Sequence, residues 1–247
     1  MQANKQKYFN AIGYEPEPCQ WDIHNSDKRF RVNIQGRRSG KSYASAREAE
    51  VAIYTPETRG WVVAPTYDLA AKIGREIHQN LVLNQQFAIT KRMVGGSMFS
   101  ATFKNGSEVS LKSAENPDSL IGEGLDWLII DEAAILPKRT WEQYLRPTLS
   151  DRSGWVLFVS TPRGFNWLYD LYIRGQSSDY PEWESWQHAS HGSRYFRDSV
   201  ENLKHELTKE TYLQEYEAQF TSFAGKVYPF SRDVHVKRLD RNDAWET

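Results

Sequence analysis

Cysteine is almost absent from this chain, since Cys19 is the single one among 247 residues. One cysteine cannot form an intramolecular disulfide bond, and zinc sites built from several cysteine ligands are excluded as well. Such sparse use of cysteine is typical of proteins in a reducing compartment. The content of hydrophobic (39%) and aromatic (13%) residues is nevertheless sufficient for a sizeable apolar core.

Long apolar runs and an excess of one charge are also missing. No stretch approaches the roughly 18 apolar residues of a membrane span, and residues 1–18 lack the apolar segment of a secretion signal. We therefore expect no membrane contact. Lysine plus arginine (31) nearly equals aspartate plus glutamate (32), so the formal net charge is −1. A nucleic-acid partner would therefore need a local basic face.

Short apolar runs alternate along the chain with stretches of helical periodicity. Continuous apolar runs are typical of parallel strands covered on both faces, and strands that alternate with helices indicate an α/β fold. Asn105-Gly106 indicates a β-hairpin. The expected strands cover residues 30–34, 60–64, 98–103, 108–111, 127–130 and 155–159, and helices are expected from residue 42 onward and over residues 69–83 and 196–220.

The segment Gln-Gly-Arg-Arg-Ser-Gly-Lys-Ser joins the first expected strand to the first expected helix. It matches the phosphate-loop pattern G-x-x-x-x-G-K-[S/T], except that Gln35 replaces the leading glycine and Gly36 follows it. Backbone N–H groups of such a loop and the following helix N-terminus form a concavity for phosphate oxygens. Gly40 would allow close backbone approach, Lys41 would reach the β- and γ-phosphates, and Ser42 would bind Mg²⁺.

We expect nucleotide contacts along the whole loop. The alternative is a basic turn that contains Gly-Lys-Ser by chance, but the position between a strand and a helix favours nucleotide binding. Arg37 and Arg38 add positive charge near the expected γ-phosphate. The expected contact residues are Gln35, Gly36, Arg37, Arg38, Ser39, Gly40, Lys41, Ser42 and Tyr43.

Two further apolar strands end in polar residues. Asp131 and Glu132 follow the strand at residues 127–130, and in nucleotide hydrolases such an aspartate holds Mg²⁺ while such a glutamate polarises the attacking water. A solvated strand end is the alternative. Ser160 and Thr161 end the next strand, where a hydroxyl beside the γ-phosphate can couple its release to movement. A simple Ser-Thr-Pro turn is the alternative there.

In this order and spacing, the segments QGRRSGKS, LIIDEAA and FVSTPRG resemble the ATPase domain of the large terminase subunit of tailed bacteriophages. Residues 64–66 (APT) resemble the family's helicase-type motif, and residues 214–220 resemble the end of its ATPase region. Gln20 is similar to the family's upstream glutamine, which contacts adenine, and Arg37 is similar to its phosphate-loop arginine. A leading residue other than glycine is itself typical of the family.

The resemblance implies a RecA/ASCE-type P-loop NTPase fold, with a mostly parallel central sheet flanked by helices and a small helical lid. It also implies a motor that hydrolyses ATP with Mg²⁺ and moves viral DNA into a procapsid. Lys41, Glu132 and Arg37 would be catalytic, and Ser42 and Asp131 would hold the metal. The implied partners are double-stranded DNA, the portal protein, a small terminase subunit and further copies of the chain in a pentameric ring. The isolated chain would be a monomer, and the location would be the host cytoplasm.

The resemblance also divides the chain into four expected regions. These are an N-terminal helix and adenine-side loop (residues 1–29, with the loop at residues 14–21), the ATPase core (30–195), a helical lid or linker (196–232) and a linker toward an absent nuclease domain (233–247). Asp233, Asp240 and Asp243 have no strand context that would support a metal cluster, so nuclease activity is not expected.

One departure from the family concerns the arginine that acts on a neighbour's ATP. Ile121 stands before Gly122, where the family often has arginine. The candidate replacements are Arg139, Arg146 and Arg163. Where measured, an arginine finger contributes about 10³–10⁵ in rate, so a lone subunit would hydrolyse ATP slowly.

Other functions and other residues remain open. A helicase would need a second RecA-like domain, and a non-enzymatic nucleotide-binding module would use the acidic pair only structurally. His188 and His191 carry a weak metal-ligand signal, and ordinary polar roles are the alternative. Trp183 and Trp186 would pack a small outer element. The side chains that would face DNA phosphates, or simply water, are Lys72, Arg75, Lys91 and Arg92.

Overall fold

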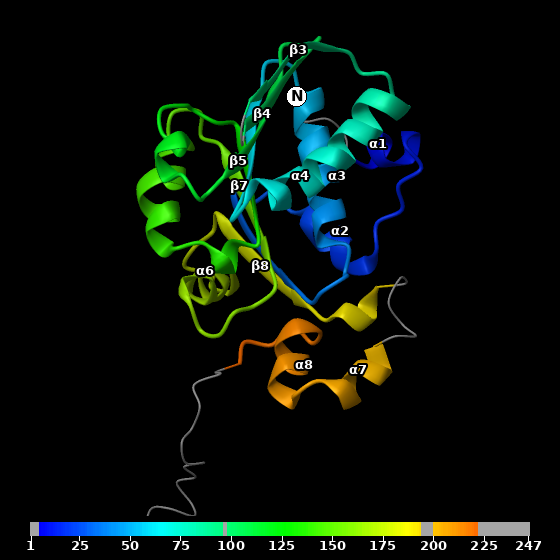
Figure 1. The fold of residues 1–247 in the computed structure, drawn as a ribbon, viewed down its shortest axis with the longest axis vertical. Coiled ribbons are helices and arrows are strands. Elements are labelled where there is room, and N and C mark those ends of the chain that lie inside the picture. The colour runs from blue at the N-terminus through cyan, green and yellow to red at the C-terminus, as the bar shows by residue number, and fades with distance from the viewer. Residues whose placement is uncertain (1–4, 96–97, 194–199, 222–247) are drawn as a thin grey trace, which may run out of the picture.

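One mixed β-sheet lies between two layers of helices in the computed structural model, which describes residues 5–95, 98–193 and 200–221 (Figure 1). Its strand order is β3-β4-β5-β2-β6-β7-β1-β8. The strands are β1 (Phe30–Gln35), β2 (Arg59–Ala64), β3 (Ile89–Gly95), β4 (Met98–Phe103), β5 (Glu108–Ser113), β6 (Trp127–Asp131), β7 (Trp155–Ser160) and β8 (Trp183–His188).

Most of the sheet is parallel. The β3–β4 and β4–β5 pairs are antiparallel, whereas β5, β2, β6, β7, β1 and β8 run parallel to one another. Strand β7 lies between β1, which leads into the glycine-rich loop, and β6, which leads into the acidic pair. This arrangement confirms the predicted RecA/ASCE-type fold.

Alternate side chains of the central strands enter two separate apolar cores. One core joins Val62, Ile129 and Leu157 to the helices drawn to the right of the sheet in Figure 1. These are α1 (Lys5–Ala11), α2 (Pro18–Asn25), α3 (Lys41–Tyr54) and α4 (Tyr67–Ile77), and α4 continues into the π-helical segment η1 (His78–Asn84).

The second core joins Val32, Ile130 and Phe158 to the elements on the opposite face. These are the 3-10 turns η2 (Pro117–Leu120) and η3 (Ala133–Ile135), the π-helical segment η4 (Thr140–Leu145), α5 (Arg146–Thr148) and α6 (Trp167–Gln176). Within the described residues, no helix is both long enough and apolar enough to cross a membrane.

Helices α7 (Val200–Glu206) and α8 (Lys209–Glu215) form a small separate layer below the sheet, beyond β8 and the 3-10 turn η5 (Ser190–Gly192) (Figure 1). Tyr212 is buried there against Leu203, Leu207 and Tyr216. The helix predicted over residues 196–220 is thus two short helices, and residues 196–199 lie outside the described part. Since α8 follows the strand that pairs with β1, its C-terminal end can reach the glycine-rich loop.

Helix α2 corrects the predicted loop over residues 14–21. Pro18 occupies the first turn, where its missing N–H costs no hydrogen bond. Glu17 and Gln20 form a reciprocal capping box, which fixes the start of the helix at Pro18. Residues 18–21 are therefore helical and do not belong to the loop.

Strand β8 corrects the prediction of a small outer element around Trp183 and Trp186. The strand pairs with β1 over its whole length, and Trp183 stacks on Phe30 with ring centroids 4.6 Å apart. Strand β8 lies at the edge of the sheet, so only part of it is buried. Its sequence therefore mixes polar and aromatic residues and lacks the continuous apolar run of a central strand.

Candidate active site

The glycine-rich loop connects the carboxyl end of β1 to the amino end of α3. Gly40 is the N-cap of α3 and has φ +79°, a left-handed conformation that suits glycine. A Cβ atom at Gly40 would lie 2.6 Å from Gln20 Nε2, so a larger residue there would displace the Gln20 amide. The loop therefore presents the N-terminus of a 14-residue helix, where backbone N–H groups attract phosphate oxygens.

The buried Gln35 side chain explains why the leading glycine is replaced. Its Oε1 accepts a hydrogen bond from Ser39 Oγ at 2.8 Å, which bridges the two ends of the loop. Its Nε2 donates to Cys19 O at 3.4 Å. The glycine moves to position 36 because a Cβ atom there would lie 2.5 Å from Tyr216 O. The structure thus brings Gln35 and Gly36 together as parts of one loop.

Asp131 lies opposite this loop at the carboxyl end of β6. Ser42 Oγ donates to Asp131 Oδ2 at 3.4 Å, while Asp131 Oδ1 is buried and has no hydrogen-bond partner among the described residues. Burial raises the pKa of Asp131 to about 6, and the charge of Glu132 adds to the rise. A buried carboxylate oxygen without a donor fits a site for a cation.

Mg²⁺ is the cation that these residues fit. A carboxylate and a hydroxyl are oxygen ligands, which Mg²⁺ prefers, and it typically uses one or two protein carboxylates together with phosphate oxygens. Ser42 and Asp131 are therefore the pair that would hold it. Within the described part of the chain, no cluster of three or more His, Cys, Asp or Glu side chains forms another metal site.

The ammonium of the buried Lys41 is close enough to Glu132 and Asp131 to be affected by their charges. Its Nζ donates to Gly36 O at 3.5 Å. Burial lowers the pKa of Lys41, while the charges of Glu132 and Asp131 oppose this change. The two carboxylates therefore act on Lys41 by charge, so the structure brings these three predicted residues together.

Glu132 has a strained backbone. Its φ of +50° and ψ of +43° are left-handed, a conformation that costs energy for a residue with a side chain. Strained positions of this kind cluster at active sites. Its half-buried carboxylate acts by charge on Lys41 and Arg37, so it faces the loop.

Ser160 and Thr161 lie at the carboxyl end of β7, next to both other strand ends. Ser160 pairs in register with Ile34 of β1, and Val159 pairs with Asp131. The Ser160 hydroxyl accepts a hydrogen bond from Ala134 N at 3.2 Å. It therefore supports the turn that follows Glu132, a contact that the sequence did not indicate.

The C-terminal end of α8 covers the loop, which the sequence pattern did not reveal. Arg37 N donates to Glu215 O at 2.7 Å, and its guanidinium Nε pairs with the Glu215 carboxylate. Ser190 Oγ donates to Arg37 O at 2.7 Å. Gly164 N, in the turn after β7, donates to Gln214 Oε1 at 3.1 Å. Helix α8 thus contacts the segments that follow β1 and β7.

Arg38 and Tyr43 complete the predicted contact set. Both side chains are exposed, and Arg38 has a left-handed φ of +57°. The guanidinium of Arg47 lies 4.5 Å from the centre of the Tyr43 ring. Beside Tyr43 lies a cavity of about 480 Å³, whose lining includes Tyr14, Gln20 and Gly40. This cavity adjoins the phosphate loop at Gly40.

The three arginines considered for action on a neighbour's ATP lie in different places. Arg139 and Arg163 are exposed, and Arg163 follows the carboxyl end of β7. Arg146 instead lies over the Phe30 ring at 5.0 Å, and Phe30 begins β1 at the opposite end of the sheet. Ile121, in the family's arginine position, is 61% exposed.

The backbone of His188 lies beside the phosphate loop, since Gly36 N donates to His188 O at 3.0 Å. His188 pairs with Asp22 at 3.0 Å and His191 with Glu217 at 3.5 Å, so both histidines have carboxylate partners. Lys72, Arg75 and Lys91 are exposed. The described structure does not include the side chain of Arg92 or the residues Asp233, Asp240 and Asp243.

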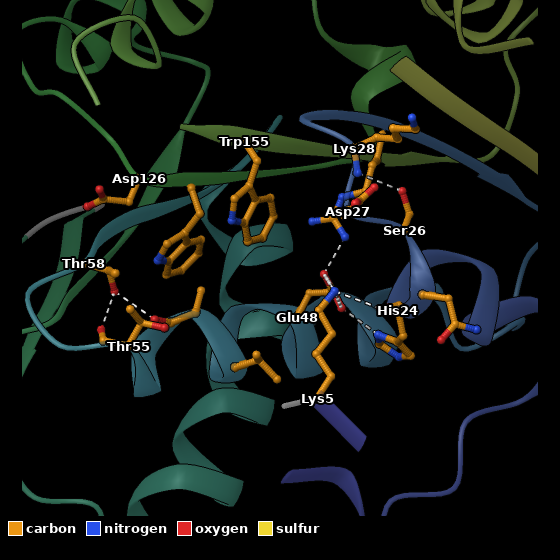
Figure 2. Close-up of a pocket in the computed structure, with 15 residues that line it drawn as sticks. Lys5, His24, Ser26, Asp27, Lys28, Glu48, Thr55, Thr58, Asp126 and Trp155 are labelled. Atoms are coloured by element: carbon orange, nitrogen blue, oxygen red, sulfur yellow. Dashed lines mark hydrogen bonds and ion pairs between the residues drawn. The ribbon is translucent and has the colours of Figure 1, made fainter. Parts of the chain in front are cut away.

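A larger cavity, of about 610 Å³, lies at the opposite end of the sheet (Figure 2). Its lining includes Arg31, Asp126 and Trp155, which lie at or beside the amino ends of β1, β6 and β7. It is therefore separate from the phosphate loop.

A family model and individual relatives all match this chain to the same protein family. A family model described as terminase large subunit, T4likevirus-type, N-terminal, matches residues 34–232. The large terminase subunit of Thermus phage G20c is 34% identical over 261 residues, which covers 90% of this chain and 52% of that protein. The large terminase subunit of Escherichia phage T5 is 33% identical and is covered to 48% of its length. The chain thus spans about half the length of the curated relatives it matches.

Solved structures agree with these sequence matches. The large terminase ATPase domain of Thermus phage P74-26 superimposes with a TM-score of 0.76 at 31% identity, over 89% of this chain and 99% of that domain. The large terminase of bacteriophage HK97 has the same fold, with a TM-score of 0.60 at 16% identity, over 85% of this chain and 45% of that one. The chain belongs to the terminase large subunit family, and it corresponds to the N-terminal region of those proteins.

Proposed function

We propose that this chain is an ATP-hydrolysing motor domain that moves viral double-stranded DNA into a procapsid. The observation that carries the proposal is the convergence of Ser42, Lys41 and Glu132 on Asp131. The buried Oδ1 of Asp131 lacks a hydrogen-bond partner among the described residues. Membership of the terminase large subunit family supports the same function.

Each side chain in the pocket has a role in in-line attack of water on the γ-phosphate. Lys41 neutralises charge on the β- and γ-phosphate oxygens. Ser42 and Asp131 would hold Mg²⁺, which would supply further charge neutralisation when bound. Glu132, whose carboxylate acts by charge on Lys41, would orient and polarise the attacking water.

Arg37 assists only after it changes partner. The guanidinium of Arg37 is paired with Glu215. A γ-phosphate would compete for the same cation, so nucleotide binding would loosen α8 from the loop. Ser160 and Thr161 would respond to the same phosphate from the end of β7. Residues 196–232 would then act as a lid on the core formed by residues 30–195.

The base of ATP would lie in the cavity beside Gln20 and Tyr43. Residues 1–29 would thus close the adenine side. The proposed partners are double-stranded DNA, the portal protein, a small terminase subunit and further copies of the chain in the host cytoplasm. In that ring Arg139 or Arg163 would reach a neighbour's ATP, since both are exposed.

The test combines calorimetry and phosphate release. We expect the purified chain to bind ATP with Mg²⁺ and to release phosphate slowly. Binding without any release would favour a nucleotide-binding module, and absence of binding would refute the assignment. Binding to double-stranded DNA should be independent of sequence and should weaken steeply with salt.

A further inference from the structure

A buried series of hydrogen bonds connects the phosphate loop to the middle of helix α3. Gln20 Nε2 donates to Gly40 O at 3.3 Å, and Gln20 Oε1 lies 2.9 Å from Tyr14 Oη. Tyr14 Oη lies 3.0 Å from His24 Nε2, and His24 Nδ1 lies 2.8 Å from Glu48 Oε1. All four side chains are buried, so water cannot easily replace these contacts.

The direction of the Gln20 contacts is fixed by its neighbours. Glu17 N donates to Gln20 Oε1 at 2.8 Å, and a backbone N–H can only donate. The amide therefore cannot be flipped. Because Oε1 accepts only, Tyr14 must donate its single hydroxyl proton to Gln20.

The same argument fixes both nitrogens of His24. Tyr14 Oη has given its proton to Gln20, so His24 Nε2 must donate to that oxygen. Glu48 Oε1 is a carboxylate oxygen, so His24 Nδ1 must donate as well. An imidazolium is the one form of His24 with which every contact in the series carries a proton.

Charged groups from three elements surround this imidazole. Figure 2 shows Glu48 between His24 and Lys5, with dashed lines to both. Burial alone would raise the pKa of Glu48, but Arg31 and Lys5 hold it well below its usual range. Burial lowers the pKa of His24, whereas the hydrogen bond and charge of Glu48 oppose this and Lys5 and Arg31 add to it. The aromatic rings that contact His24 are those of Phe9, Tyr14 and Trp21.

We propose that His24 and Glu48 are positioning residues for the base side of the ATP site, and that they act through Tyr14 to fix the amide of Gln20. The inference rests on the proposed function. In the fully bonded arrangement, both lone pairs of Gln20 Oε1 are occupied and one N–H of Nε2 is used by Gly40. One N–H remains, and it fits a ring-nitrogen acceptor of the base.

Loss of one proton from His24 breaks the series at a defined link. Tyr14 then turns its hydroxyl proton to His24 Nε2, and Gln20 Oε1 faces an oxygen with no proton between them. The amide loses one of its three anchors, so contacts to the base weaken. The phosphate loop keeps its own contacts, because Lys41 and Ser42 are bonded independently of Tyr14.

The experiment compares two ligands by calorimetry, ATP and inorganic tripolyphosphate, each with Mg²⁺. Tripolyphosphate lacks a base and reports on the phosphate loop alone. Tyr14→Phe should weaken ATP binding about 3- to 10-fold, as expected for one lost hydrogen bond, and leave tripolyphosphate binding unchanged. Tyr8→Phe is the matched control, because its hydroxyl bonds to Glu50 rather than to this series and should alter neither affinity.

A pH series between about 5 and 8 provides the second readout. In the unchanged chain the ratio of ATP affinity to tripolyphosphate affinity should fall as the pH rises and His24 loses its proton. The ratio should not depend on pH in Tyr14→Phe. ¹⁵N NMR of the histidine ring should show both nitrogens protonated at the pH where the ratio is highest.

Equal weakening of both ligands by Tyr14→Phe would overturn the inference, as would a neutral His24 ring at the highest ratio. An unchanged ATP affinity in Tyr14→Phe would also overturn it. If the unchanged chain bound neither ligand, the proposed function itself would fail, so the two failures are distinguishable.

Discussion

Buried carboxylates at the two ends of the parallel sheet have opposite environments and opposite pKa shifts. At the amino ends of β1 and β7, Glu48 contacts Arg31, Lys5 and His24, and its pKa lies well below the usual range. At the carboxyl ends, the buried Asp131 has one hydroxyl contact and the repelling charge of Glu132, and its pKa rises to about 6.

The number of partners distinguishes a buried carboxylate that stabilises the fold from one that is available to bind a ligand. A buried carboxylate with three cationic or donor partners stabilises the native state in the absence of ligand, and breaking such a set is strongly destabilising. A buried carboxylate with an unpartnered oxygen destabilises the nucleotide-free chain, and it becomes favourable when a cation completes its contacts. The pairing of a buried charge thus distinguishes the two sites, although a large cavity lies beside Glu48.

The largest effect is expected at Glu132. Glu132→Gln should lower turnover by about 10²–10⁴-fold, because it removes the group that polarises water. ATP affinity measured by calorimetry should not change. Glu142→Gln, a change at an exposed carboxylate paired with Lys138, is the control. Normal phosphate release by Glu132→Gln would contradict the role of the residue.

Glu48→Gln tests the structural end of the sheet. It should lower the free energy of unfolding by about 3–5 kcal/mol at neutral pH, because its three partners lose the buried negative charge that they contact. A lowered pKa gives stability that is present above the unfolded-state pKa and is lost as pH falls through the folded-state value. The difference between the two proteins should therefore shrink in acid.

Urea unfolding at neutral and acidic pH measures this effect. Glu108→Gln breaks a partly exposed pair with Arg59 and should cost less than about 1 kcal/mol. Equal losses from the two substitutions would show that Glu48 has no special structural role.

Lys41→Ala tests the phosphate loop directly. Removal of a charge-assisted contact should weaken ATP binding by roughly 10- to 100-fold. Lys72→Ala, on the exposed surface of α4, should leave the affinity unchanged. If calorimetry gave the same affinity for Lys41→Ala as for the unchanged chain, ATP would have to bind elsewhere.

Asp131→Asn should have the opposite sign to Glu48→Gln. It removes a buried, repelled charge, so the nucleotide-free chain should gain roughly 1–2 kcal/mol of unfolding free energy. Phosphate release should be lost in the same variant. Thermal and urea unfolding without Mg²⁺ measure the gain, and a destabilisation like that of Glu48→Gln would remove the contrast between the two ends of the sheet.

The smallest effect concerns the contact between the loop and α8. Arg37 is 58% exposed, so its pair with Glu215 should contribute only about 0.2–1 kcal/mol to stability. A double-mutant cycle of Arg37→Ala and Glu215→Gln measures this coupling. Coupling of several kcal/mol would mean that α8 is fixed to the core and cannot act as a lid.

Local sequence patterns predicted the fold and most of the pocket. The apolar runs that become β1, β6 and β7 are buried on both faces, and such strands carry their signal in consecutive residues. Their polar ends meet because parallel strands place their carboxyl ends at one edge of the sheet. Edge strand β8 and helix α2 were missed, since an edge strand buries few residues and α2 depends on a capping box.

The sequence by itself determined which groups can bind a nucleotide, because a glycine in a left-handed turn, a lysine and a serine act within a few consecutive residues. Only the tertiary structure decided which partners these groups have. Arg37 pairs with a residue 178 positions away, and Ser42 donates to Asp131, which is 89 positions away. Such contacts depend on how distant segments pack, and no spacing along the chain encodes them.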